Sequence, residues 1–472
     1  MFTQQINQQS QSIYTVKQSQ LARYILIALM TCVCVLAMSF PATAQAEVRK
    51  SDIILGQSVE ARGLPTTACP NISCDYALLI DKSGNVFFER GALTPARIAS
   101  MTKIMTAIVA LENSNPTDVV TVDYEAATVG ESSAALREGD TMSMQTALLA
   151  LMVPSGNDAA IAVAKTVGKM LDPQAYDPEQ VFVDAMNAKA AELGCRDTVY
   201  ENPHGLDINQ FDGQLQSTAA DMGRIVTYCM QNDAFREIVA HGDTSITVTS
   251  ANGTPREIML ESTDELIGVY DGIAGIKTGY TESAGYCFAG AVIRDEGEYY
   301  SVVMNSPSSE QRFADTTELM DWVYAHHVSY PLATSDESTT MTTSEGSIEV
   351  PVVAHVAHQD WIDVTIPATL SNPTQEVTVF DLSGNITQSV EYLPVSGDIH
   401  TGDIIGSITF TQRSVEIARM DIVATQDVLA PSLIEGIKIW WDRLFRGISG
   451  EPKVAQSVLV NQTPLLIDKS ND

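Results

Sequence analysis

The sequence predicts an α+β domain that is followed by a small all-β domain and a C-terminal amphipathic helix. Strand-like segments begin at Tyr76 and return near residue 270, and apolar residues recur at helical spacing between them. Strands at both ends of a domain with helices in the middle are typical of an α+β fold. Beyond residue 347, short runs of alternating apolar and polar residues predict strands only, and the last regular segment has one apolar helical face.

Local patterns place the elements of the first domain, which is expected over residues 47–333. A Lys-Ser-Gly-Asn turn separates the strand that begins at Tyr76 from a second strand. Apolar residues three and four positions apart predict a helix near Met101, and a Pro-Ser-Gly break divides two later helices. The other predicted elements are helices at 144–153, 159–167, 182–193 and 318–326, and strands at 285–293 and 299–304.

Composition divides the remainder of the chain. A stretch at 334–346 that is rich in Ser, Thr, Glu and Asp is expected to be a linker. Residues 347–428 are expected to form the β-rich domain, residues 431–449 the amphipathic helix, and residues 450–472 a tail.

One face of this last helix is apolar throughout and contains two of the four Trp residues of the chain. Its members are Leu433, Ile434, Ile437, Trp440, Trp441, Leu444, Phe445 and Ile448. Such a face either packs on its own domain or lies in the plane of a membrane surface. We expect the second, because the segment is terminal and Trp suits the headgroup region. The helix is too short and too charged to span a bilayer.

The N-terminus has the pattern of an export signal. Lys17 and Arg23 precede an apolar run at 24–40, and small residues in an Ala-x-Ala pattern follow it. The pattern predicts a cleaved signal peptide over residues 1–46, with an uncleaved membrane anchor as the alternative. Either interpretation places the remainder outside the cytoplasm, at the extracytoplasmic face of the cell membrane or in the cell wall.

Charge and residue spacing exclude several classes of ligand. The chain has 27 Lys and Arg against 59 Asp and Glu, and a net charge of -32 repels a phosphate backbone, so no nucleic-acid partner is expected. No Cys or His spacing matches a zinc site, and no metal or other cofactor is expected. Cys69 and Cys74 could close a small disulfide loop or remain free thiols, and the sequence leaves both possibilities open.

Ser100 and Lys103 form a Ser-x-x-Lys motif at the start of the first apolar helix. Residues three apart share a helix face, so the hydroxyl and the amine can meet in one pocket. A serine hydroxyl becomes a strong nucleophile only when a neighbouring base takes its proton. A lysine can be that base only if burial or a nearby cation lowers its pKa.

Two further motifs are candidates for the same site. Ser155 and Asn157 belong to a Ser-Gly-Asn turn that interrupts two apolar helices, unlike two copies of these letters between strand-like runs. Lys277, Thr278 and Gly279 enter a later strand pair. There a cation, a hydroxyl and a residue without a side chain can receive an extended anionic ligand.

Together the three motifs resemble those of the serine D-Ala-D-Ala carboxypeptidases, the low-molecular-mass penicillin-binding proteins. The segments at 98–106, 201–207 and 275–281 are similar to landmarks of that family. The resemblance implies a β-lactamase/transpeptidase-like catalytic domain, an antiparallel sheet with helices. It also implies removal of the terminal D-alanine from peptidoglycan stem peptides ending in D-Ala-D-Ala, and acylation by β-lactam antibiotics.

The resemblance also implies a role for each motif residue. Ser100 would attack the substrate carbonyl, and Lys103 would accept its proton. Ser155 and Asn157 would relay protons and orient the substrate amide. The remaining residues would bind substrate. Lys277 and Thr278 would hold its carboxylate, with Arg312 nearby, and Gly279 would let the substrate backbone approach closely. The backbone N–H groups of Tyr280 and Ser100 would form the oxyanion hole.

Two other functions fit parts of the pattern. A class A β-lactamase is expected to have Asp where Gly156 stands, together with a carboxylate that hydrolyses the acyl-enzyme, and we identify no such carboxylate. A catalytically silent wall-binding scaffold on the same fold would not need every catalytic side chain. The balance among carboxypeptidase, endopeptidase and transpeptidase activity is open, because all three share the acyl-enzyme.

Overall fold

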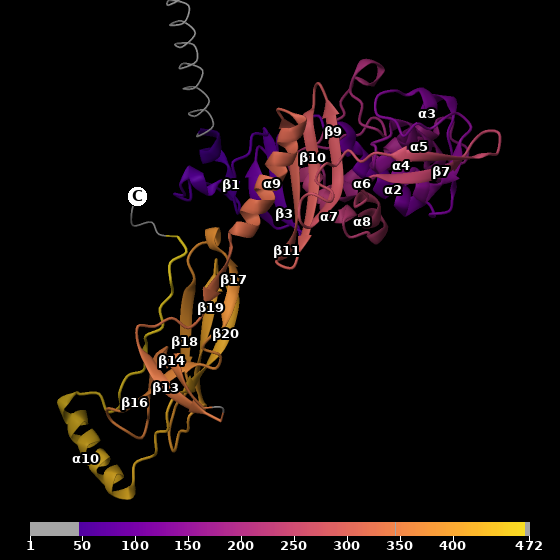
Figure 1. The fold of residues 1–472 in the computed structure, drawn as a ribbon. Helices are drawn as coiled ribbons and strands as arrows, with labels where there is room; N and C mark the ends of the chain where they lie inside the picture. The colour runs from indigo at the N-terminus through magenta and orange to yellow at the C-terminus, as the bar shows by residue number, and fades with distance from the viewer. Residues whose placement is uncertain (1–46, 345, 468–472) are drawn as a thin grey trace, which may run out of the picture. The chain divides into compact units, whose positions relative to one another are not determined.

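A computed structural model of the chain describes residues 47–344 and 346–467, so the predicted signal peptide at 1–46 lies outside the described residues. The described chain forms two compact units, and the division falls between Met320 and Asp321 (Figure 1). This point lies inside helix α9 (Ser309–Ala325), which begins before the predicted closing helix at 318–326.

The first unit is built on a seven-stranded antiparallel sheet with strand order β2-β1-β4-β3-β11-β10-β9. Its strands are β1 (Ile53–Ile54), β2 (Gln57–Ser58), β3 (Tyr76–Asp81), β4 (Val86–Arg90), β9 (Ile273–Thr281), β10 (Gly285–Arg294) and β11 (Gly297–Ser306). The strand pairs at the two ends of the domain therefore meet in one sheet, because β3 pairs with β11. Strand β9, which contains Lys277, is an edge strand. The predicted α+β class is confirmed.

Helices from the middle of the sequence form the other half of this unit (Figure 1). They are α2 (Thr102–Asn113), α3 (Tyr124–Thr128), α4 (Met144–Met152), α5 (Asn157–Leu171), α6 (Pro178–Glu192), α7 (Ala219–Cys229) and α8 (Asp233–Val239). Helix α2 is buried on all sides, since every residue from Thr102 to Ala110 is buried. Lys103 is therefore carried into the core with its helix.

A second sheet of four strands in this unit was not predicted from the sequence. It has the order β5-β6-β7-β8, with β5 (Val119–Thr121), β6 (Thr141–Ser143), β7 (Thr244–Thr249) and β8 (Pro255–Leu260). Two of its strands have three residues each, which is too short for alternation to be recognised. Helices α7 and α8 were also not among the predicted elements.

The second unit contains mainly strands. Its largest sheet has the order β18-β19-β20-β16-β15-β21, from β18 (Thr387–Tyr392), β19 (Ile404–Gln412), β20 (Val415–Ala424), β16 (Thr365–Leu370), β15 (Ala354–Ala357) and β21 (Val458–Leu459). Two further pairs are β12 (His327–Pro331) with β17 (Glu376–Phe380), and β13 (Ser338–Thr343) with β14 (Gly346–Pro351). The predicted all-β region is confirmed.

Two segments of the second unit differ from the expectation. The predicted linker at 334–346 contains β13, because its Thr residues are β-branched and suit a strand even on an exposed hairpin. The expected tail contains β21, which pairs with β15. Polar composition alone led to both assignments, and it does not distinguish an exposed strand from a linker.

Helix α10 (Leu433–Ser449) begins at Ser432, which forms a capping box with Glu435, and ends at Gly450 in the left-handed conformation. None of its residues is buried, and Leu433 is 90% exposed. The helix is attached by its polar face instead. Arg443 donates to the carbonyls of Gln359 and Trp361, and Arg446 pairs with Asp363.

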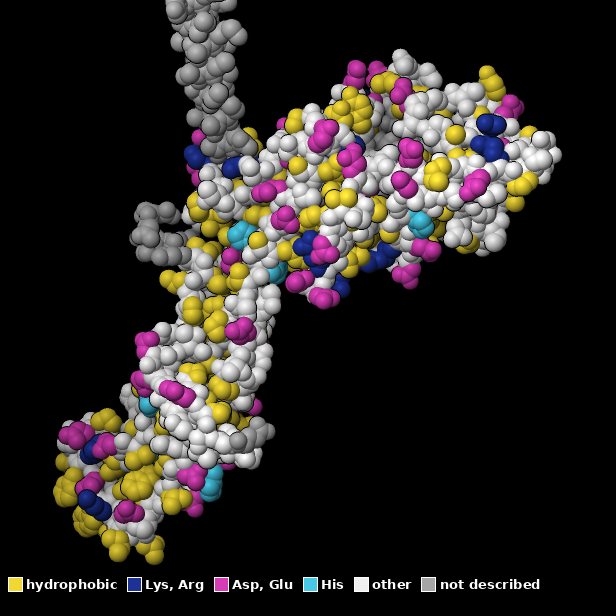
Figure 2. Space-filling model, viewed as in Figure 1, with side chains coloured by type: hydrophobic (Ala, Val, Ile, Leu, Met, Phe, Trp, Pro, Cys, Tyr) yellow, Lys and Arg dark blue, Asp and Glu magenta, His cyan; other side chains and the backbone are white. Residues whose placement is uncertain are grey.

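Figure 2 shows hydrophobic side chains gathered over α10. The apolar residues that the sequence assigned to one face are all exposed. None of the helices in the described ranges is both long and apolar enough to cross a membrane. Cys69 and Cys74 are separate buried thiols.

Candidate active site

Ser100 lies in a short 3-10 turn, Ala99–Met101, that leads directly into α2. The turn is tightly constrained, because Ala99 has a φ of +47° and Gly205 lies against its carbonyl. A Cβ at Gly205 would lie 1.9 Å from the carbonyl oxygen of Ala99, so a larger residue would displace the turn. Ser100 remains half-buried between two fully buried neighbours. Such strain is typical of functional sites.

Lys103 reaches back to the Ser100 hydroxyl. Its Nζ lies 2.9 Å from Ser100 Oγ, 2.7 Å from Asn157 Oδ1 and 2.8 Å from the carbonyl oxygen of His204. Lys103 is completely buried and has no carboxylate partner among the described residues. Burial, together with the positive charge of Lys277, lowers the pKa of Lys103 well below its usual range, although Asp158 acts in the opposite direction.

The Ser-Gly-Asn turn joins α4 to α5 and faces the same pocket. Ser155 has a φ of +63°, and its buried Oγ has no hydrogen-bond partner in the described chain. Asn157 donates from Nδ2 to the carbonyl of Gly130 at 3.0 Å, which orients its Oδ1 toward Lys103. A Cβ at Gly156 would lie 2.7 Å from the carbonyl oxygen of Ala150, so this backbone does not accommodate the Asp of a class A β-lactamase.

Asp158 holds the loop that covers this turn, and the sequence analysis did not identify it. Its buried carboxylate accepts from Ser133 Oγ at 2.6 Å and from the N–H groups of Ala134 and Leu136 at 2.9 and 3.1 Å. Because Asp158 follows Asn157 directly, the loop and the Ser-Gly-Asn turn are fixed together.

Lys277 and Thr278 lie on edge strand β9, and both are buried. Lys277 Nζ donates to the carbonyl and the hydroxyl of Thr278 at 3.2 and 3.4 Å. Thr278 donates to the Thr263 hydroxyl at 2.7 Å. Burial and the positive charge of Arg312 lower the pKa of Lys277 to about 7, while Asp264 acts in the opposite direction.

Gly279 brings β9 against the turn that contains Ser100. A Cβ there would lie 2.8 Å from the carbonyl oxygen of Ile98 and 3.3 Å from the backbone N of Ser100. A residue without a side chain is therefore required for this approach.

Tyr280 and Arg312 both lie near the ring of Tyr286. Tyr280 is half exposed, and its ring stacks on Tyr286 with the centroids 4.3 Å apart. The guanidinium of buried Arg312 lies 5.7 Å from the Tyr286 centroid and donates to the carbonyl of Gly279 at 3.4 Å. Arg312 is thereby joined to the strand that carries Lys277.

His204 was not among the predicted site residues, but the structure gives it a specific contact. Its carbonyl, rather than its ring, accepts from Lys103. The ring is buried, its Nδ1 accepts from the N–H of Leu206, and burial with nearby Lys103 lowers its pKa to about 3. No residue pattern could have predicted a contact made by a backbone carbonyl.

The structure thus brings the predicted residues into one region, but only some of them are in direct contact. Ser100, Lys103 and Asn157 form a hydrogen-bonded set, and Gly279 packs on the backbone of that set. Lys277 acts on Lys103 through its charge. Within the parts of the chain that are described, no three His, Cys, Asp or Glu side chains are grouped to hold a metal ion.

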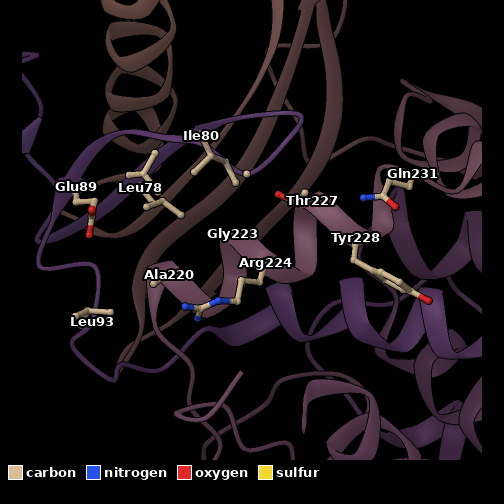
Figure 3. A pocket seen from close by; sticks show the side chains of 12 residues that line it. Leu78, Ile80, Glu89, Leu93, Ala220, Gly223, Arg224, Thr227, Tyr228 and Gln231 are labelled. Carbon is tan, nitrogen blue, oxygen red and sulfur yellow. The ribbon is translucent and has the colours of Figure 1, made fainter. Parts of the chain in front are cut away.

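A separate groove lies between α7 and the β3–β4 hairpin (Figure 3). Leu78 and Ile80 come from the sheet, and Arg224, Thr227 and Tyr228 come from the helix. None of the three sequence motifs lines this groove. The candidate active site is the group of motif residues around Ser100.

Comparisons with known proteins agree with this geometry. Residues 64–308 match a family model described as D-alanyl-D-alanine carboxypeptidase. The chain is 25% identical over 369 residues to D-alanyl-D-alanine carboxypeptidase DacF of Bacillus subtilis, covering 77% of this chain and 87% of that protein. It is 32% identical over 251 residues to a D-alanyl-D-alanine carboxypeptidase of Streptomyces sp., with coverages of 52% and 84%.

Solved structures show the same fold. The Streptomyces K15 DD-transpeptidase covers 54% of this chain and 98% of its own, with a TM-score of 0.50 and 29% identity. DacD of Francisella tularensis covers 76% of this chain and 95% of its own with a TM-score of 0.51, and at 22% identity this likeness concerns the fold alone. The family match spans more than half of the chain. The chain therefore belongs to the D-alanyl-D-alanine carboxypeptidase family and is a serine peptidase.

Proposed function

We propose that this protein is exported and removes the terminal D-alanine from peptidoglycan stem pentapeptides through an acyl-enzyme on Ser100, the serine that β-lactams also acylate. The contact of 2.9 Å between Ser100 Oγ and the buried amine of Lys103 carries this proposal. An uncharged amine at this distance can take the hydroxyl proton as the nucleophile attacks.

The hydrogen bonds around Lys103 support a specific proton position. A neutral amine has two N–H bonds and one lone pair. The carbonyl oxygens of Asn157 and His204 can only accept, so they take both N–H bonds. The lone pair then faces Ser100, and the serine hydroxyl donates to it. This is the arrangement that a general base requires before the reaction begins.

The substrate would lie along β9 with its terminal carboxylate at Lys277 and Thr278. This order places the scissile carbonyl over Ser100, with the N–H groups of Ser100 and Tyr280 as oxyanion donors. The close approach of Gly279 to Ser100 supports this geometry. The positive charge of Lys277 would bind the carboxylate and also disfavour protonation of Lys103.

The reaction then has two halves. Ser100 Oγ bonds to the carbonyl carbon as its proton passes to Lys103, and the C–N bond to the terminal D-alanine breaks as the departing amine receives that proton. We propose that the Ser155 hydroxyl, which is buried and lacks a partner in the described chain, relays this proton. Water then cleaves the ester and regenerates Ser100. An amine acceptor in place of water would give transpeptidation, and a cross-linked substrate would give endopeptidase activity.

Covalent labelling tests the proposal. A fluorescent penicillin should label the wild-type protein and fail to label Ser100→Ala, and D-alanine release from a pentapeptide should be lost together with the label. Ser83→Ala is a matched control, because Ser83 lies in an exposed Ser-Gly-Asn turn on the β3–β4 hairpin. Retained labelling of Ser100→Ala would refute the assignment, and rapid turnover of the label would indicate a β-lactamase.

We further propose that α10 holds the protein on the surface of a membrane. The polar face of the helix is attached to the second unit through Arg443 and Arg446, which leaves the apolar face exposed. Large exposed apolar patches mark interaction sites, and Trp residues on such a face suit the headgroup region. The alternative of a helix docked by its apolar face does not fit the exposure of Ile434, which is 83%.

Vesicle sedimentation tests the membrane contact. Deletion of everything after Val428 also removes β21, so substitution within α10 is the cleaner experiment. The double variant Trp440→Ser/Trp441→Ser should lose most of its binding to phospholipid vesicles and keep its D-alanine release from a soluble peptide. Asp442→Asn, on the polar face, is the control. Unchanged sedimentation of the double variant would exclude α10 as the anchor.

A further inference from the structure

A buried carboxylate lies beside the Lys277 strand and has no part in the proposed reaction. Asp264 follows β8 in the chain, and only 9% of its surface is exposed. One oxygen, Oδ1, accepts from the N–H of Leu266 at 2.9 Å. The other, Oδ2, is buried and has no hydrogen-bond partner in the described residues. A carboxylate buried in this way is costly, so its position calls for an explanation.

Asp264 is fixed next to the carboxylate-binding residues of the site. Asp264, Lys277 and Thr278 line one small cavity. The preceding residue, Thr263, joins this segment to Thr278 through a hydrogen bond of 2.7 Å between their hydroxyls. Because of these contacts, we expect a change of charge at residue 264 to alter the environment of Lys277.

The charges around Lys277 are unbalanced without Asp264. Lys277 and Arg312 are both buried, and their hydrogen bonds within the described chain go to carbonyl and hydroxyl oxygens rather than to carboxylates. Lys103, on α2, is a further basic group that interacts with Lys277, and His241 lines the same cavity as Asp264. The remaining acidic neighbour, Glu265, is exposed.

We propose that Asp264 is a positioning residue that keeps Lys277 protonated, and so able to bind the terminal carboxylate of the substrate. This inference rests on the proposed function. A carboxylate in direct contact with Lys277 would compete with the substrate for the ammonium group. Asp264 instead acts from the wall of the shared cavity. Burial of both side chains strengthens the electrostatic interaction between them, and Lys277 Nζ stays available to a ligand.

The pKa directions agree with this role. Asp264 raises the pKa of Lys277 against the opposing effects of burial and Arg312, and the resulting value is about 7. Burial raises the pKa of Asp264 to about 6, while Lys277 and Arg312 lower it, so its carboxyl is ionised at neutral pH. Removing this charge lowers the pKa of Lys277. The ammonium form is then lost at a lower pH, and carboxylate binding is lost with it.

The test is the pH dependence of KM for D-alanine release from an N-acetylated tripeptide ending in D-Ala-D-Ala. In the wild-type protein KM should rise as pH increases through about 7. In Asp264→Asn, which keeps the acceptor for Leu266, the rise should begin about one pH unit lower. At pH 7.5 the KM of the variant should exceed that of the wild type about tenfold, with kcat changed far less.

Three further variants serve as controls or as a substitute in this test. Glu261→Gln removes one exposed charge three residues earlier and should follow the wild-type profile. Asp264→Glu retains the charge and should restore the wild-type position of the rise. If Asp264→Asn does not fold, Asp264→Ser removes the same charge and offers a hydroxyl to the turn.

The outcomes separate the two proposals. Coincident KM profiles for Asp264→Asn and the wild type would overturn the inference, and so would an equal shift in Glu261→Gln. Both leave the proposed function intact, because the wild-type protein still releases D-alanine. A wild-type protein that releases none at any pH would refute the proposed function itself.

Discussion

The candidate active site around Ser100 and the helix α10 place their side chains in opposite environments. The site buries two lysines without a direct carboxylate partner, whereas α10 exposes a whole apolar face that includes Trp440 and Trp441. Each arrangement is costly for an isolated folded chain. Burial adjusts the chemistry of the lysines, and exposure makes the apolar residues available to a second surface. The two places where the structure departs from ordinary folding rules are thus the places to which we assign the two proposed functions.

The largest expected effect comes from removing the buried base. Lys103→Met keeps an unbranched side chain that is one atom shorter and removes the amine, so Ser100 loses its proton acceptor. We expect D-alanine release and penicillin acylation to fall about 10²–10⁴-fold, measured as single-turnover rates. Lys165→Met, at a half-buried lysine of α5, is the control and should react at the wild-type rate. A wild-type acylation rate in Lys103→Met would contradict the role of the amine.

A smaller effect is expected from filling the close approach at β9. The Cβ of Gly279→Ala would meet the carbonyl of Ile98 at 2.8 Å and push the strand away from the N–H of Ser100. Loss of one oxyanion donor costs about 10²–10³ in rate, so we expect acylation to slow about 10²-fold while the melting temperature changes little. An unchanged acylation rate would show that the strand approach does not matter for catalysis.

The smallest effect is expected from the same substitution in α10. A Cβ at Gly436 meets no atom within 4 Å, and the residue lies inside a regular helix. Gly436→Ala should therefore raise the free energy of unfolding by about 0.5–1 kcal/mol, measured by denaturant titration, with D-alanine release unchanged. A decrease in stability would indicate that α10 packs more closely than its exposure suggests.

Side-chain chemistry made much of this account predictable from the sequence. The motif residues that meet around Ser100 could be identified from the sequence, because the types and the spacing of their side chains indicate their chemistry. The helical periodicity near Met101 predicted helix α2, although not its complete burial, and the apolar face of α10 predicted an amphipathic helix. The boundaries at 333/334, 346/347 and 428 remain predictions, as does the signal peptide at 1–46.

Contacts that depend on the backbone could not be predicted. The His204 carbonyl binds Lys103, and any residue at that position would offer the same atom. The left-handed conformations of Ala99 and Ser155 follow from the surrounding packing rather than from residue type. Asp158 and Asp264 acquire their roles from long-range contacts, because each looks like an ordinary polar residue in the sequence. Short strands such as β5 form through pairing, which local patterns do not encode.

The state of the Lys103 amine is the most direct test of the account. The protein would be prepared with isotope-labelled lysine, and side-chain NMR signals would be followed from pH 6 to 11, with Lys103 assigned by its absence in Lys103→Met. We predict a neutral Lys103 amine throughout the range in which the enzyme is active, with no titration near 10.5. A Lys103 signal that remains cationic at neutral pH and titrates near 10.5 would contradict the proposed mechanism.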